Sequence, residues 1–227
     1  SNTTEMIKWY TLAAKQNYGP ALFNLAVYFD KRPEEEAAKK SLKYYELAAN
    51  AGYAPALTNL GVIKAHGIQV KKDIKAGIDL LTKAAEQNYI SSYFNLGVAY
   101  EELAHTKKIP IYEVYALRWY KQAALKGHLK SIQNLGFMLE SATGTNKDLE
   151  LAHMWINISI GILCSRDRLK CRWAEKLFKG PSLSTTNHLW DLRIKIERQL
   201  TGAQIKKAHK RAKDLISNNA YIKKQMF

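Results

Sequence analysis

A tripeptide of asparagine, leucine and a small residue recurs at a nearly constant interval in this chain. It reads N-L-A at Asn24 and N-L-G at Asn59, Asn95 and Asn134. An Ala-Ala pair repeats in step with it, beginning at positions 13, 48, 84 and 123. Self-similarity at a steady period of this length is the sequence signature of a repeat architecture. The chain is therefore predicted to fold as an array of similar units.

The two spacings within one period behave differently. The step from each Ala-Ala pair to the next asparagine is identical in all four copies (13 to 24, 48 to 59, 84 to 95 and 123 to 134), whereas the step from each asparagine to the following pair lengthens along the chain. One connection is therefore fixed and short, and the other accepts insertions, such as a lengthened loop in AHTKKIPIYE (104–113). Both motifs carry apolar residues at helical spacing. The expected unit is a hairpin of helix A, which carries the asparagine, and helix B, which carries the Ala-Ala pair.

Small and aromatic residues recur at fixed places in these helices. Glycine takes the second place after the asparagine at positions 61, 97 and 136, and Ala26 stands there in the first copy. Because glycine inside a helix costs about 1 kcal/mol relative to alanine, its recurrence predicts a neighbouring backbone that passes too close for a side chain. Aromatic pairs at 9–10, 44–45 and 119–120 precede the Ala-Ala pairs and are interpreted as packing residues.

Composition excludes several classes of function. The 227 residues contain no apolar run of about 18 residues, so no membrane-spanning helix is predicted. No Ser/His/Asp or Cys/His order and no Gly-rich phosphate loop stands out, so we predict neither an enzyme nor a cofactor. The six histidines (66, 105, 128, 153, 188 and 209) are scattered, and no metal site is predicted. On one continuous helix Cys164 and Cys171 are too far apart to bridge, so two unpaired thiols are expected unless a turn separates them.

Positive charge is concentrated near the C-terminus. The net charge of the chain is +15; residues 1–163 carry 19 basic and 15 acidic side chains, and residues 164–227 carry 16 basic and 5 acidic ones. A basic cluster is expected on one helix. Its members are Lys206, Lys207, Lys210, Arg211 and Lys213. It indicates either a solvated helix face or a surface for anionic lipid; nucleic acid is less favoured because no stacking aromatic residues accompany it.

Residues 8–163 resemble the Sel-one-like repeat (SLR) family, a relative of the tetratricopeptide repeat, in its bacterial form. The matching signature is A-x-x-N-L-G in helix A, followed by W-Y-x-x-A-A and an Asn/Gly-Tyr turn in helix B, and HGIQVKKDIKAGIDLLTKAAEQNY (66–89) matches it closely. HMWINISI (153–160) and RQLTGAQIKKAHKRAKDL (198–215) resemble the closing segments of bacterial members. The loop at 30–40 lacks the usual glycines.

The resemblance implies an all-α fold class, a right-handed α/α superhelix of stacked antiparallel helix hairpins. Residues 1–163 are expected to hold helix B of a truncated repeat and then four hairpins, and residues 164–227 a divergent hairpin and a basic capping helix. Thr201 and Gln204 form a capping box at which that helix is predicted to start. Because residues 4–17 read as a helix B without its helix A, we expect further repeats before residue 1 in the natural protein.

The resemblance also places a binding groove on the concave face formed by the A helices. The groove residues expected from this register are Phe23, Asn24, Val27, Thr58, Asn59, Val62, His66, Phe94, Asn95, Val98, Glu101, Gln133, Asn134 and Phe137. Its floor would be apolar, with an acidic margin that includes Asp30, Glu102 and Glu140. The asparagines are interpreted first as structural residues that hold adjacent hairpins in register, and otherwise as ligands of a peptide backbone.

Two functions remain open at this point. The first is a non-catalytic adaptor that binds a protein or peptide in the groove, as family members typically do; the second is anionic lipid binding through the basic helix. Bacterial members of the family occur in envelope functions or host interaction, which implies a periplasmic, secreted or host-delivered protein with any signal sequence outside residues 1–227.

Overall fold

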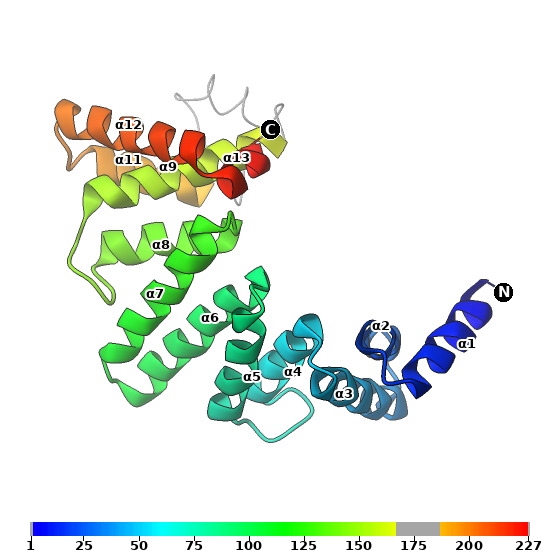
Figure 1. The fold of residues 1–227 in the computed structure, drawn as a ribbon. Coiled ribbons are helices and arrows are strands. Elements are labelled where there is room, and N and C mark those ends of the chain that lie inside the picture. Colours follow the sequence, from blue (N-terminus) through cyan, green and yellow to red (C-terminus); the bar gives the residue numbers. More distant parts are fainter. Residues whose placement is uncertain (1, 167–186, 227) are drawn as a thin grey trace. The chain divides into compact units, whose positions relative to one another are not determined.

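The computed structural model describes residues 2–166 and 187–226, and these residues form twelve α-helices and no strand (Figure 1). The helices are α1 (Asn2–Lys15), α2 (Gly19–Asp30), α3 (Glu35–Asn50), α4 (Ala54–His66), α5 (Ile74–Glu86), α6 (Ile90–Lys107), α7 (Ile111–Leu125), α8 (Leu129–Ser141), α9 (Leu149–Arg166), α11 (Asn187–Glu197), α12 (Gly202–Asn218) and α13 (Ala220–Met226). They fall into two compact units, Ser1–Ala99 and Tyr100–Phe227. None of the described helices is both long and apolar enough to cross a bilayer.

The helices alternate as the repeat predicts. The four asparagines lie in α2, α4, α6 and α8, and the four Ala-Ala pairs lie in α1, α3, α5 and α7. Within the units, α2 packs on α3, α4 on α5, and α8 on α9. The boundary that the sequence suggests at residue 163 falls inside α9, and the division of the chain at that residue stays a prediction.

The fixed connection from helix B to the next helix A is a short turn of the same length in all four copies. One residue of each turn has a positive φ: 58° at Asn17, 77° at Gly52, 59° at Asn88 and 79° at Gly127. Glycine and asparagine are the residues that tolerate this left-handed conformation best. The N–H of the next residue then donates to the carbonyl of the first alanine of the pair, as from Tyr53 to Ala48 at 3.1 Å. This hydrogen bond, together with that from Gly52 to Ala49, is the Schellman motif that ends a helix.

The insertion in the third repeat lengthens a helix and leaves the loop short. α6 has 18 residues, whereas α2 has 12 and α4 has 13. Residues 108–110 alone connect α6 to α7, and Lys108, with φ 55°, ends α6 in a left-handed turn. The expectation of a long loop in AHTKKIPIYE is therefore wrong, because most of this segment is helical.

Glycines allow two helices of the first unit to cross at close range. A Cβ atom placed on Gly61 of α4 would lie 2.8 Å from Cγ of Leu81 and 3.0 Å from the carbonyl oxygen of Gly77 in α5. One placed on Gly77 would lie 2.7 Å from the Gly61 oxygen and 2.9 Å from the Ala65 nitrogen. The predicted close backbone approach is confirmed here. At Gly136 the nearest atom is a side-chain carbon of Ile156, at 2.6 Å.

The aromatic pairs of helix B pack unequally. The second member is buried in α3 and α7, with Tyr45 3% and Tyr120 0% exposed. Trp9, a first member, is 62% exposed. The packing interpretation is therefore confirmed for Tyr45 and Tyr120 and wrong for Trp9, whose helix α1 has no helix A before it among the described residues.

The second unit is built around α9, which packs against α8, α11, α12 and α13. Trp155 and Ile156 of α9 lie in its apolar core. The predicted capping box is present, since Thr201 Oγ1 accepts from the N–H of Gln204 and Gln204 Oε1 accepts from the N–H of Thr201. Ala208 and Ala212 of α12 are buried, and α12 packs on α9, as a capping helix should.

Cys164 near the end of α9 is engaged in a disulfide bond. The expectation of an unpaired thiol is therefore wrong for Cys164. It rested on a continuous helix through both cysteines, and Cys171 lies outside the described residues.

The crossing of α4 and α5 gives a testable prediction. Replacing Gly77 with alanine should lower the free energy of unfolding by about 1–3 kcal/mol, because the new methyl group meets backbone atoms that cannot move alone. The measurement is urea unfolding followed by circular dichroism. Gly202→Ala is the control, because a Cβ there meets nothing within 4 Å. Equal stability of the two variants would contradict the close-crossing argument.

Candidate functional site

The groove positions of the first unit lie on α2, α4 and the start of α6. Half-buried side chains occur at Phe23, Asn24, Val27, Asn59, Val62, Phe94, Asn95 and Val98, and His66 is exposed. Thr58 differs from the expectation, because it is 3% exposed and its hydroxyl donates to the Ala54 carbonyl at 2.9 Å. Its side chain therefore offers no surface to a partner.

Phe23 belongs to the packing between adjacent hairpins. Its ring centre lies 5.9 Å from that of Tyr45 in α3 and 5.5 Å from that of Tyr53, which immediately precedes α4. Edge-to-face and tilted pairs at these distances are favourable. Phe23 therefore has a packing role in addition to any role in binding a partner. The valines at 27, 62 and 98 make no such ring contact because their side chains are aliphatic.

Two asparagine amides of the repeat bind tyrosines of the preceding helix B. Asn59 hydrogen-bonds the hydroxyl of Tyr45, and Asn134 that of Tyr120. Burial raises the pKa of Tyr45, and the nearby charge of Asp30 adds to this shift. Asn95 has no tyrosine in the equivalent place, where Leu81 stands, and its amide donates to the Ser91 carbonyl at 3.0 Å instead. The asparagine is thus used inside the scaffold at residues 59, 95 and 134.

In the second unit the carboxylate of Glu101 also bonds the tyrosine that Asn134 contacts. The Tyr120 hydroxyl donates to Glu101 Oε2 at 2.6 Å. Burial and this contact raise the pKa of Tyr120, so the hydroxyl stays protonated. Glu101 and Phe137 are exposed, while Gln133 and Asn134 are half-buried. Glu140, expected on an acidic margin, pairs with Lys195 Nζ at 2.9 Å, and its side chain is only 12% exposed.

The tyrosines that bind these asparagines could have been predicted from a second repeated position, in helix B. A tyrosine stands at one fixed place of helix B in three of the four copies, at positions 10, 45 and 120. In the copy that has Leu81 at this place, Ala65 occupies the helix A position that holds Asp30 or Glu101 in its neighbours. Tyrosine and acid are thus absent together, and both Ala65 and Leu81 are 1% exposed.

The basic cluster on α12 is solvent-exposed at all five positions: Lys206, Lys207, Lys210, Arg211 and Lys213. Two of the five are occupied by one carboxylate of α9. Lys207 Nζ lies 2.9 Å and Arg211 Nη1 3.9 Å from Glu150 Oε2. The cluster therefore both ties α12 to α9 and presents charge to solvent.

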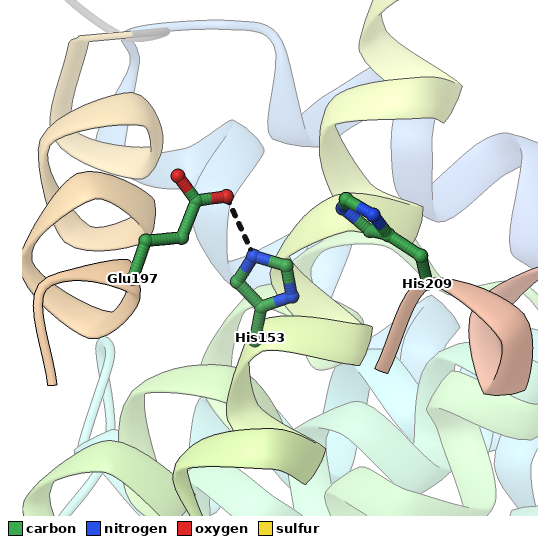
Figure 2. Close-up of side chains that lie close together, drawn as sticks. All are labelled: His153, Glu197 and His209. Atoms are coloured by element: carbon green, nitrogen blue, oxygen red, sulfur yellow. Dashed lines mark hydrogen bonds and ion pairs between the residues drawn. The ribbon is translucent and has the colours of Figure 1, made fainter. Parts of the chain in front are cut away.

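A group of titratable residues that the sequence did not predict joins α9, α11 and α12. Figure 2 shows His153 between Glu197 and His209, each from a different helix. His153 Nε2 lies 2.7 Å from Glu197 Oε1, and the two imidazole ring centres are 5.1 Å apart. The two histidines are far apart in the sequence, and the fold brings them together. His153 is fully buried, and His209 is exposed.

The partners of this group define its protonation. Burial lowers the pKa of His153, so the ring is neutral near pH 7. Asn157 Nδ2 lies 2.9 Å from His153 Nδ1, and Arg193 Nε donates to Glu197 Oε1 at 2.8 Å. Burial would raise the pKa of Glu197, but the hydrogen bonds from His153 and Arg193 outweigh it and the pKa is lowered.

Comparison with known sequence families identifies the repeat. The pattern of the Sel1 repeat matches residues 7–18, 19–53, 54–89, 90–128 and 130–159, which is more than half of the chain. The chain belongs to the Sel1 repeat family. This family membership and the observed helices confirm the predicted all-α fold class of stacked helix hairpins. A search of curated proteins found no match.

Two solved structures share the fold of this Sel1 repeat chain. One is c5321, a protective antigen present in uropathogenic Escherichia coli strains and displaying an SLR fold, with a TM-score of 0.72 and 23% identity. The match covers 97% of this chain and 42% of c5321, so the chain spans less than half of that protein. The other is a Sel1 repeat protein from Oxalobacter formigenes, with a TM-score of 0.62, 24% identity, and coverage of 82% and 75% of the two chains.

The tyrosine–asparagine pair gives the second prediction. Asn59→Ala should lower the free energy of unfolding by about 1–3 kcal/mol, because it leaves the buried Tyr45 hydroxyl without this partner. Asn95→Ala should cost less than about 1 kcal/mol, because among the described residues its amide bonds within its own helix, to the Ser91 carbonyl. Urea unfolding of both variants, with Tyr45→Phe and the double variant completing a cycle for Asn59, measures the coupling. Independent effects of Tyr45→Phe and Asn59→Ala would contradict the register role.

Proposed function

We propose that this chain is a non-catalytic scaffold that binds a protein or peptide on its helix A face. Sel1 repeat proteins are in general non-catalytic scaffolds for protein–protein interaction. The helix A face is defined here by Val27, Val62, Phe94 and Val98, which all lie in the first unit. Gln133 and Phe137 are the equivalent positions proposed in the second unit, and Glu101 is proposed beside them.

One observation carries the proposal. The third place after each asparagine is apolar in every copy, as Val27, Val62, Val98 and Phe137, and none of these side chains is buried. Phe137 is 37% exposed. A solvent-facing helix position normally varies and is polar, so an apolar residue repeated at one partly exposed place supports a contact surface.

The chemistry of this face favours an apolar segment as the ligand. Such a segment, extended or helical, would place successive apolar side chains against successive A helices. In the first unit Asp30 is exposed and would favour a basic residue in the ligand. In the second unit Glu101 is exposed, whereas Glu140 is already paired with Lys195. The asparagine amides are engaged inside the scaffold, so the side chains around them are the better candidates for specificity.

The third prediction tests this face with a defined probe. Peptides selected on the purified chain from a random displayed library should be rich in apolar residues. Val62→Asp and Phe94→Asp should each weaken their binding at least about tenfold, measured by fluorescence anisotropy. The matched control is Leu47→Asp, an exposed apolar position (38%) on helix α3, which should bind as the wild type does. Circular dichroism checks that each variant keeps its helices.

The salt dependence of binding distinguishes the helix A face from the basic cluster of α12. Binding to an apolar face should change little between low and high salt, whereas binding through the lysines should weaken steeply. Selected peptides that bind the Val62 and Phe94 variants as tightly as wild type would reject the helix A face.

A second candidate function rests on the exposed basic cluster of α12. Lys206, Lys210 and Lys213 belong to no ion pair within the part of the chain that the structure describes, and they are exposed. Ala208 and Ala212 of the same helix are buried, so α12 has no apolar face left to enter a bilayer. Attachment to anionic lipid would therefore be electrostatic only.

The fourth prediction concerns this cluster. If it binds lipid, the chain should cosediment with vesicles of phosphatidylserine and phosphatidylcholine but not with phosphatidylcholine alone, and high salt should release it. Replacing Lys206, Lys210 and Lys213 with glutamate should abolish cosedimentation. Replacing the exposed Lys39, Lys43 and Lys83 of α3 and α5 is the charge-matched control. If the chain cosediments with neither kind of vesicle, the cluster is only a solvated helix face.

A further inference from the structure

We propose that His153, Glu197 and His209 form a binding site for a divalent transition-metal ion, with Zn²⁺ as the best fit. Their ligand atoms all lie within 4.8 Å of one another. The residues come from α9, α11 and α12, so an ion held by them would join three helices at the C-terminal end of the chain (Figure 2).

The donor set suits zinc and related ions. Two imidazoles and one carboxylate are typical protein ligands of Zn²⁺, each at about 2.0–2.2 Å, and a water completes the tetrahedron. Ligand atoms in such a tetrahedron are roughly 3.4 Å apart. His153 Nε2 and Glu197 Oε1, now 2.7 Å apart, need to separate only slightly. His209 is exposed, so its side chain can move toward the ion.

A second shell is already in place. Metal-binding histidines usually hold their other ring nitrogen in a hydrogen bond, which fixes the orientation of the ring. Asn157, one helical turn after His153, contacts His153 Nδ1 at 2.9 Å. In the hydrogen-bonded form the Nε2–H donates to Glu197, and the amide donates to Nδ1. When an ion binds, the ring proton moves from Nε2 to Nδ1, and the Asn157 amide turns to present its oxygen to it. The ring stays neutral, so no net proton is released by His153.

Some of the nearby cations are held by carboxylates, whereas Lys206, Lys210 and Lys213 are exposed to solvent. Arg193 Nε donates to Glu197 Oε1 and its guanidinium lies 5.2 Å from the Trp190 ring centre. Glu197 has a second oxygen, so the arginine and the ion can share its carboxylate. Lys207 and Arg211, which flank His209 on α12, are drawn to Glu150. The charge that would oppose an ion is therefore partly neutralised.

An ion at this place would stabilise the packing of α11 and α12 on α9. Among the described residues, His153 and Glu197 already connect α9 to α11 by a hydrogen bond, but His209 adds only a ring contact. Coordination would convert that contact into a bond between α12 and the other two helices. The exposed side of His209 leaves the ion open to solvent, where water would fill the remaining position.

The test uses the full chain, without a polyhistidine tag and after treatment with a chelator. Titration calorimetry with zinc chloride should show one ion per chain, and binding should raise the melting temperature. His209→Ala should weaken binding at least about tenfold and remove the shift in melting temperature. This variant is preferred over one at His153 because His209 is exposed and the fold does not depend on its burial.

Controls separate this site from adventitious binding. His188→Ala removes an exposed histidine of α11 outside the cluster and should leave zinc binding unchanged. Glu197→Gln should weaken it, Co²⁺ should give visible absorption bands that His209→Ala abolishes, and Mg²⁺ should not bind. The proposal is overturned if wild type binds no zinc, if His209→Ala binds it as tightly as wild type, or if His188→Ala loses it equally. These outcomes are independent of peptide binding to the helix A face.

Discussion

The left-handed turn that follows each Ala-Ala pair is the constraint on which the repeat depends. The turn reverses the chain over a very short stretch and lets two N–H groups cap the end of helix B. Because only a small set of residues tolerates the conformation, the turn holds Asn17, Gly52, Asn88 or Gly127. Two of the turns also contact each other, since Gln87 Nε2 donates to the Gly52 carbonyl at 2.9 Å across one repeat. The constant spacing between each Ala-Ala pair and the next asparagine follows from this geometry.

Once the turn fixes the end of helix B, side chains set how the next helix A lies on it. Alanine at 48 and 84 has almost no exposed surface, so the helices approach closely there. The hydrogen bond between the buried Tyr45 and the half-buried Asn59 then fixes the position of helix A along helix B, because apolar contact alone would allow the two helices to slide. Where Leu81 replaces the tyrosine, Asn95 has no tyrosine partner, and Leu81 packs instead against Gly61 of the preceding helix A.

Most of the fold could be predicted from the sequence because the same local pattern of residues occurs in each repeat. The period, the hairpin, the fixed turn and the capping box of Thr201 are all local features, and they agree with the structure. The length of α6 was not predictable from the period, since an insertion can extend either a helix or a loop. The burial of Thr58 was missed because the register alone placed it with Phe23 and Phe94, whose larger side chains are only half-buried. The short side chain of Thr58 is buried instead and bonds the Ala54 carbonyl.

The His153 cluster could not be predicted for a different reason. Its members, at positions 153, 197 and 209, are far apart in the sequence and belong to helices whose packing follows no repeat. Only the packing of α11 and α12 on α9 brings them together. Repeats bury apolar residues against their neighbours, but the last one needs a cover of its own. Here that cover includes a buried imidazole with polar partners, and a core built for stability alone would have used an apolar residue at such a place. A buried histidine where α11 and α12 cover α9 therefore supports a role in ligand binding in addition to packing.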